Sequence, residues 1–132
     1  MGPSLADLCN PSEHAEQTHF FLMAAYLLTP EQYELLYAIP NGGLRDKRNA
    51  ASLTTEGVRR GVPDVSFDYP SNGYHGLRIE FKRRKKSKTS EEQIRKIELL
   101  NKHGYRAVIC KGCDEAIEEL TNYLKGDCKH NA

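Results

Sequence analysis

Several features that would mark a specialised class of protein are missing from this sequence. The 132 residues include no tryptophan and no run close to the ~18 apolar residues that a membrane span needs. The first residues show no signal-peptide pattern, so we expect a cytoplasmic protein with no membrane partner. With 39% hydrophobic and 28% charged residues, the composition is typical of one soluble globular domain, and the length is too short for two.

A large net charge is also missing, because the formal total is only +1. The positive residues are nevertheless concentrated, since twelve of the nineteen lysines and arginines lie between positions 45 and 88. Local basic patches attract a polyanion whatever the total charge, through release of counterions from phosphates. The alternative interpretation is that these residues lie in solvated, flexible loops, which is compatible with binding a phosphate backbone. The residues that we predict to contact a phosphate backbone are Arg45, Lys47, Arg48, Arg59, Arg60, Arg83, Arg84, Lys85 and Lys86.

Two short extended runs, 62–69 and 77–83, carry the most informative residues. Both runs are rich in β-branched and aromatic residues, and the turn-rich segment 70–76 between them predicts a hairpin. Alternation in the second run places Glu80 and Lys82 on one face and their apolar neighbours in the core. An antiparallel partner would then bring Asp64 beside Glu80.

This arrangement suggests metal chemistry. Carboxylate oxygens are hard ligands, so Asp64 and Glu80 could hold a Mg²⁺ or Mn²⁺ and leave positions for water and a phosphate. Lys82 could orient the water or stabilise developing negative charge, and the backbone carbonyl of Phe81 could add a further oxygen. A solvated strand face is the alternative, because alternating charges are common on exposed strands.

The spacing of these residues is similar to a known pattern. Pro63-Asp64 followed by Glu80-x-Lys82 matches the PD-(D/E)XK nucleases. An ordered set of motifs over residues 12–125 more closely resembles the VRR-NUC family, in the stand-alone form found in bacteriophages. That set comprises Gly61-Val62-Pro63-Asp64, Gly73-Tyr74-His75-Gly76-Leu77, Ile79-Glu80-Phe81-Lys82, Ser90-x-x-Gln93, Gly104-Tyr105, Glu115-Ala116-Ile117, an upstream Ala38-Ile39-Pro40-Asn41-Gly42-Gly43 and Glu13-x-x-x-Gln17.

The resemblance implies a function and further site residues. It implies a metal-dependent DNA endonuclease acting on branched DNA such as four-way junctions, in the cytoplasm of a bacterial host if a phage encodes it. A homodimer is expected, because two symmetric cuts need two identical sites. By resemblance Glu13 assists at the metal, Gln93 lies close to the active site and Asn41 contacts DNA. Capping explains Gln93 without catalysis, since Ser90-Glu91-Glu92-Gln93 is a capping box.

The rest of the chain predicts an α/β fold. We expect a disordered lead-in over 1–11, a VRR-NUC domain over 12–125 and a polar tail over 126–132. Ser12 caps a helix over 12–28 whose second half is apolar almost all round apart from Tyr26, so we expect that half to be mostly buried. Residues 20–23 belong to the core or to a dimer surface. The order helix, helix, strand, helix, strand, strand, helix, strand, helix fits a mixed central sheet flanked by helices, as in the PD-(D/E)XK core.

Four cysteines suggest one competing interpretation. Cys110 and Cys113 form a C-x-x-C that could be combined with Cys128 and His130 into a zinc site. We disfavour zinc, because Cys110 ends an apolar strand and the other ligands lie in a polar tail. A second alternative is a DNA-binding module that has lost catalysis and acts through its basic segments alone.

Overall fold

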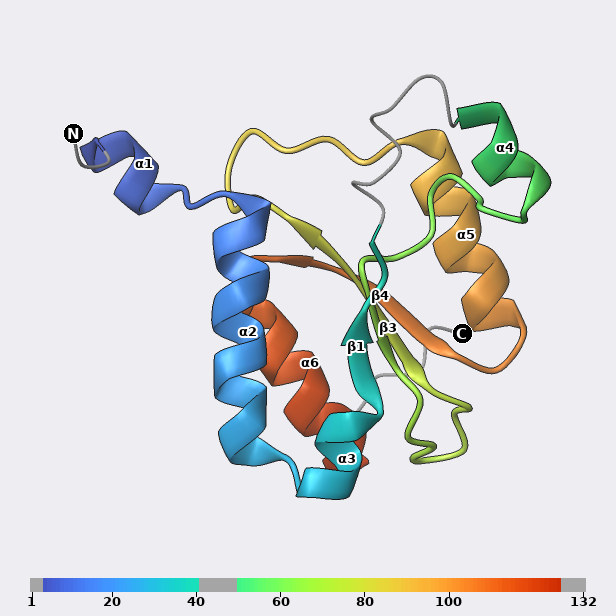
Figure 1. Cartoon of the computed structure of the whole chain (residues 1–132). Helices are drawn as coiled ribbons and strands as arrows, with labels where there is room; N and C mark the ends of the chain where they lie inside the picture. The colour runs from blue at the N-terminus through green and yellow to red at the C-terminus, as the bar shows by residue number, and fades with distance from the viewer. Residues whose placement is uncertain (1–3, 41–49, 127–132) are drawn as a thin grey trace.

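The computed structural model describes residues 4–40 and 50–126 of the chain. The predicted residues Asn41, Arg45, Lys47 and Arg48, and the tail from 127 onward, lie outside the described residues. Ten elements follow one another (Figure 1): α1 (Leu5–Cys9), α2 (Glu13–Leu27), α3 (Pro30–Glu34), β1 (Leu36–Ala38), α4 (Ala50–Thr55), β2 (Val65–Phe67), β3 (Leu77–Lys82), α5 (Glu91–Lys102), β4 (Arg106–Lys111) and α6 (Cys113–Lys125).

The predicted fold class is confirmed, and the predicted order of elements is found from α2 onward. A single mixed sheet has the strand order β1-β2-β3-β4, in which the first two pairings are antiparallel and β3 pairs with β4 in parallel. The parallel pair needs a crossover, and α5 provides it. Figure 1 shows α2 and α6 together on one face of the sheet and α5 on the other. The sheet is therefore covered on both sides, as expected for this core.

β3 is the central strand of this arrangement, because it is paired on both edges and covered on both faces. Leu77, Ile79 and Phe81 point into the main core and are fully buried. The ring of Phe81 meets that of Phe20 from α2 edge to face, with 5.4 Å between centroids. Glu80 and Lys82 point the other way and are also buried. The strand thus carries charged residues into a nearly water-free environment.

The expectation that α2 is mostly buried in its second half is wrong. Glu16, Phe20 and Ala24 are buried, and this spacing of four is that of one helical face. Leu22 and Tyr26, four residues apart, lie on the opposite side and are exposed, Tyr26 by 92%, and Leu27, at the last position of the helix, is also exposed. Only one face of α2 packs against the sheet and α6, so the remaining apolar residues form an outer stripe. Residues 20–23 are consequently divided between core and surface.

Two further differences from the sequence-based expectations concern the ends of elements. Residues Leu5–Cys9 form a short helix within the segment for which we expected disorder. The strand expected over 62–69 is regular only from Val65 to Phe67. Before it, the chain packs closely on α5: a Cβ at Gly61 would lie 2.6 Å from the carbonyl carbon of Glu92. This contact brings the 58–64 segment, with Asp64 at its end, against the start of α5.

None of the helices in these described ranges is both long and apolar enough to cross a membrane.

Candidate active site

The predicted hairpin register places Asp64 beside Glu80. Val65 pairs with Ile79 across the antiparallel β2 and β3, so the next positions outward are Asp64 and Glu80, on the opposite face from the core. The backbone of Asp64 is held by a 2.7 Å hydrogen bond from the Ile39 amide to its carbonyl oxygen. Its side chain is held by the Phe81 amide, which donates to Oδ2 at 2.8 Å. The two carboxylates therefore lie next to each other on the same face of the sheet, where β2 begins and β3 ends.

Glu80 is the most perturbed residue of this group. Its side chain is 3% exposed, and its Oε1 is buried without a hydrogen-bond partner. Burial raises the pKa of Glu80 to about 8, and the charges of Asp64 and Glu13 act in the same direction, against that of Lys82. A buried carboxylate oxygen that lacks a donor is costly unless a cation or a proton satisfies it. A cation bound at Glu80 Oε1 would satisfy this oxygen.

Gln93 connects Glu80 to Lys82. Its Nε2 donates to Glu80 Oε2 at 2.9 Å, and its Oε1 accepts from Lys82 Nζ at 2.8 Å. The same Oε1 accepts from the Ser90 amide, and the Ser90 hydroxyl accepts from the Gln93 amide, which completes a capping box at the start of α5. Both interpretations of Gln93 therefore hold: it caps the helix and it contacts the two central charged groups.

Glu13 reaches the same place from α2. It is the first residue of that helix, following the Ser12 N-cap, and it lines a cleft of about 250 Å³. The full lining of this cleft is Glu13, Arg59, Arg60, Gly61, Val62, Asp64, Glu80 and Gln93. A second cavity of about 610 Å³ adjoins it, also bordered by Glu13 and Asp64, and contains Gln17 in its wall. The structure thus brings Glu13, Asp64, Glu80 and Gln93, from four separate segments, to one cleft, and Lys82 bonds to Gln93 beside it.

The residues fit a hydrated divalent ion better than a preformed metal cage. Among residues 4–40 and 50–126, no three His, Cys, Asp or Glu side chains are already grouped as metal ligands. Mg²⁺ commonly needs only one or two protein carboxylates, because it keeps several waters. The unsatisfied Oε1 of Glu80, next to Asp64 and an open cleft, meets that requirement.

The predicted basic residues have different environments. Arg59 and Arg60 are exposed and line the cleft, and Lys85 and Lys86 are exposed on the segment after β3. The guanidinium groups of Arg83 and Arg84 instead bond within the protein, to the chain around the start of α2. The partners in that contact, Asn10 and Glu16, were not singled out as site residues from the sequence. Helical spacing was the available signal, since Glu16 lies three residues after Glu13.

Cys110 and Cys113 are both buried, one at the end of β4 and one at the start of α6. Burial raises the pKa of each thiol, so both remain protonated at neutral pH. Packing in the core accounts for both residues.

Comparison with known proteins assigns the family. The VRR-NUC domain model matches residues 11–114, which is most of the chain. The chain belongs to the VRR-NUC family. A solved structure described as a VRR_NUC domain protein is 31% identical to it, with a TM-score of 0.75 over 86% of this chain and 88% of that one. Among curated protein sequences, none gives a significant match.

Membership explains the site in general terms. A VRR-NUC domain is a nuclease-type domain of the PD-(D/E)XK fold, so DNA is its substrate, and nucleases of this family generally depend on divalent metals. The mixed sheet and the cleft at the end of the β2–β3 hairpin agree with that assignment.

The titration of Glu80 gives a prediction for the metal-free VRR-NUC protein. Its pKa is about 8 in the folded state and near 4.5 in the unfolded chain, so between these values the folded state retains a proton that the unfolded state has released. The free energy of unfolding should therefore fall as pH rises from 4.5 to 8, by at most about 1.4 kcal/mol per pH unit, and show no further loss from this group above pH 8.

Urea unfolding in EDTA at a series of pH values measures this dependence. The matched variant is Glu80→Gln, which keeps the size of the side chain and removes its titration. An equal slope in wild type and variant would show that another group causes the effect.

Proposed function

We propose that the chain is a divalent-metal-dependent endonuclease that hydrolyses phosphodiester bonds in branched DNA, such as four-way Holliday junctions, and acts as a homodimer. The observation that carries this proposal is the buried Glu80, with one unsatisfied oxygen, beside Asp64 in a cleft that Arg59 and Arg60 also line. Asp64 and Glu80 would hold Mg²⁺ or Mn²⁺, Glu13 would assist, and the backbone carbonyl of Phe81 is a proposed further oxygen.

The side chains have separable roles in this mechanism. When bound, a divalent ion would offset negative charge on the phosphate and make water more acidic. The Phe81 amide orients the carboxylate of Asp64, and Gln93 orients both the Glu80 carboxylate and the Lys82 ammonium group. Lys82 Nζ lies 3.8 Å from Glu80 Oε2, where it can donate to an attacking water or to a phosphate oxygen that gains charge.

The exposed basic residues favour DNA over a small phosphate compound as the substrate. Arg59 and Arg60 border the cleft, and Lys85 and Lys86 are exposed on the segment that follows β3. Contacts to phosphates position a duplex without reading its sequence. Selection by DNA shape is therefore the expected mode of recognition, and a branch point supplies an unusual shape.

The homodimer is supported by the outer stripe of α2, defined by Leu22, Met23, Tyr26 and Leu27. These side chains are 63%, 37%, 92% and 52% exposed and lie four residues apart in two pairs. Large exposed apolar patches often mark protein interfaces. A two-fold axis through this stripe would bury it against its own copy and place two active sites for two symmetric cuts.

The nuclease activity is tested by cleavage of labelled single-stranded, duplex, flap and four-way-junction DNA with Mg²⁺, Mn²⁺ or EDTA. We expect metal-dependent cutting, fastest on the junction, that Glu80→Gln and Lys82→Met each reduce by at least about 100-fold. The measured quantity is the single-turnover rate. Absence of cutting by the wild type with any metal, together with tight junction binding, would favour the non-catalytic DNA-binding module.

Gln93 should matter for the reaction and not only for the helix. Gln93→Ala should lower the cleavage rate about 10- to 100-fold, because Glu80 and Lys82 lose the group that orients them. The chain contains a matched control: Gln32 closes the same capping box at the start of α3, away from the cleft. Gln32→Ala should cost a similar stability, about 1 kcal/mol, with an unchanged rate. Equal rate losses in both variants would assign Gln93 to capping alone.

The dimer is tested by sedimentation equilibrium. We expect twice the 15.0 kDa mass of one chain, and a single-chain mass after Tyr26→Glu together with Leu22→Glu, because charges within the stripe would be buried unpaired. The control is Leu99→Glu, at a partly exposed apolar position on α5, which should leave the mass unchanged. A wild-type protein that sediments as a single chain at about 100 µM would contradict the dimer.

A further inference from the structure

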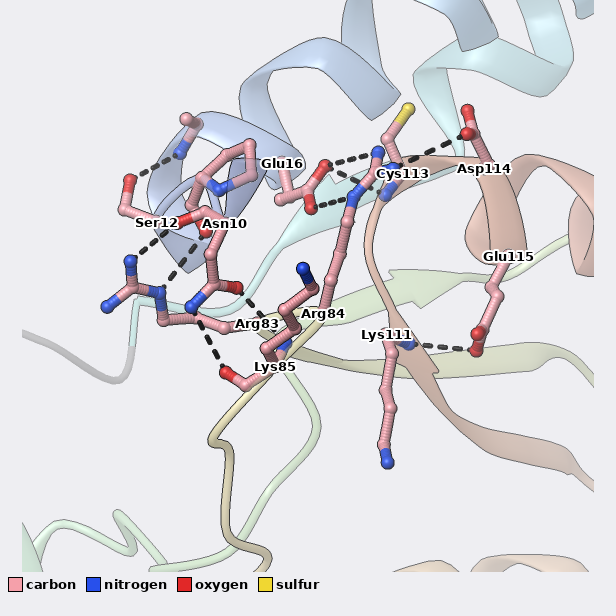
Figure 2. Close-up of polar contacts among 12 residues, drawn as sticks. Asn10, Ser12, Glu16, Arg83, Arg84, Lys85, Lys111, Cys113, Asp114 and Glu115 are labelled. Atoms are coloured by element: carbon pink, nitrogen blue, oxygen red, sulfur yellow. Dashed lines mark hydrogen bonds and ion pairs between the residues drawn. The ribbon is translucent and has the colours of Figure 1, made fainter. Parts of the chain in front are cut away.

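The segment that follows β3 is attached to the residues that precede α2. The Arg83 guanidinium donates to the backbone carbonyls of Asn10 and Pro11. The side chain of Asn10 in turn bonds the backbone of Lys85 twice, accepting from its amide at 3.0 Å and donating to its carbonyl at 3.1 Å. Figure 2 shows Arg83 and Asn10 turned toward each other. Residues 75 positions apart in sequence thus form one connection.

A second connection is formed one helical turn further along α2. The Arg84 guanidinium donates two hydrogen bonds to the Glu16 carboxylate, from Nε to Oε2 at 2.7 Å and from a terminal nitrogen to Oε1 at 3.2 Å. Glu16 is 3% exposed and also accepts from the Cys113 amide at 3.1 Å (Figure 2). The corner that supplies this amide has no room for a side chain at Gly112, where a Cβ would lie 2.8 Å from Arg84 Nε.

These two connections flank Glu13. Asn10 and Pro11 precede it and Glu16 follows it on the same helix, while Glu13 itself is exposed toward the cleft. The anchoring arginines come directly after the strand that carries Glu80 and Lys82. Arg83 and Arg84 therefore tie the start of α2, on both sides of Glu13, to the segment that leaves β3, in addition to the core contact between Phe20 and Phe81.

We propose that Arg83 and Arg84 are positioning residues that hold the start of α2 so that Glu13 faces the metal-binding carboxylates, and that they do not bind DNA. The proposal rests on the metal role of Glu13 in the proposed function. It divides the basic segment after β3 into two arginines whose guanidinium groups bond within the protein, although the Arg84 side chain is 40% exposed, and two exposed lysines, Lys85 and Lys86.

The chemistry of the two side-chain types supports this division. A guanidinium group is a planar fork that matches a carboxylate or a pair of carbonyl oxygens, whereas a lysine ammonium is a flexible point charge. The carbonyl and carboxylate partners of both arginines are already in place within the chain. The exposed Lys85 contacts Asn10 only through its backbone, so its ammonium is not part of the connection.

A double-mutant cycle between Arg83→Met and Glu13→Gln tests the proposal. Arg83 is chosen because loss of Arg84 would leave Glu16 buried without its charged partner, which is strongly destabilising. The first readout needs no DNA: the affinity for Mn²⁺, from the rise of the melting temperature with metal concentration. We expect Arg83→Met to weaken Mn²⁺ binding about tenfold and to add no further loss in the Glu13→Gln background.

The second readout is amide hydrogen exchange in the metal-free protein. We expect faster exchange in the first turn of α2 in Arg83→Met and unchanged protection in β3 and β4, which also shows that the variant is folded. The matched control is Lys85→Ala, which should keep the Mn²⁺ affinity and reduce the salt dependence of DNA binding by about one phosphate contact.

Three results would overturn the inference. If Glu13→Gln weakens Mn²⁺ binding but Arg83→Met does not, and Arg83→Met loses DNA affinity as Lys85→Ala does, then Arg83 is a DNA contact. If the losses from Arg83→Met and Glu13→Gln are additive, Arg83 acts independently of Glu13. Unchanged Mn²⁺ affinity in Glu13→Gln alone would instead remove Glu13 from the metal site, and the proposed role of the arginines with it.

Discussion

The burial of Glu80 is the constraint on which the rest of the structure depends. β3 must place Phe81 against Phe20 in the core, and strand alternation then directs Glu80 to the opposite face, where α5 covers it. A carboxylate in that position loses water and needs other partners. Gln93 satisfies one of its oxygens and leaves the other open. The fold therefore creates a site with an unmet requirement for positive charge, which is how functional sites often trade stability for chemistry.

The arrangement around Glu80 is electrostatically asymmetric. Burial and the negative charges of Asp64 and Glu13 raise the pKa of Glu80, and the positive charge of Lys82 lowers it. Asp64, Glu80 and Glu13 line the same cleft as Arg59 and Arg60. A phosphate drawn in by the arginines would be repelled by the carboxylates unless a cation stood between them. For this reason we expect bound metal to raise the affinity for DNA, and bound DNA to raise the affinity for the metal by the same factor.

The parts of the site that sequence alone could predict are those governed by local rules. Period-two alternation predicted that Asp64 and Glu80 share a face, and the capping box predicted where α5 begins. The exposure of Tyr26 was not predicted, because an apolar run does not show which face meets the sheet. The bonds from Arg83 to Asn10 were not predicted either, because no short-range pattern links residues 73 apart. Composition suggested that these arginines bind a polyanion, whereas tertiary contacts supplied closer partners.

A cluster of basic residues in a sequence can therefore include some that bond within the protein and others that remain exposed to a binding partner. The run from Lys82 to Lys86 begins with a buried lysine bonded to Gln93, continues with two arginines bonded to the chain around the start of α2, and ends with two exposed lysines. Each position follows from the path of the chain as it leaves β3 and turns outward. Because the arginines are bonded internally, the exposed positive surface is smaller than the count of bases suggests. The affinity for DNA would then depend more on the border of the cleft and the lysines, and the catalytic geometry on the arginines.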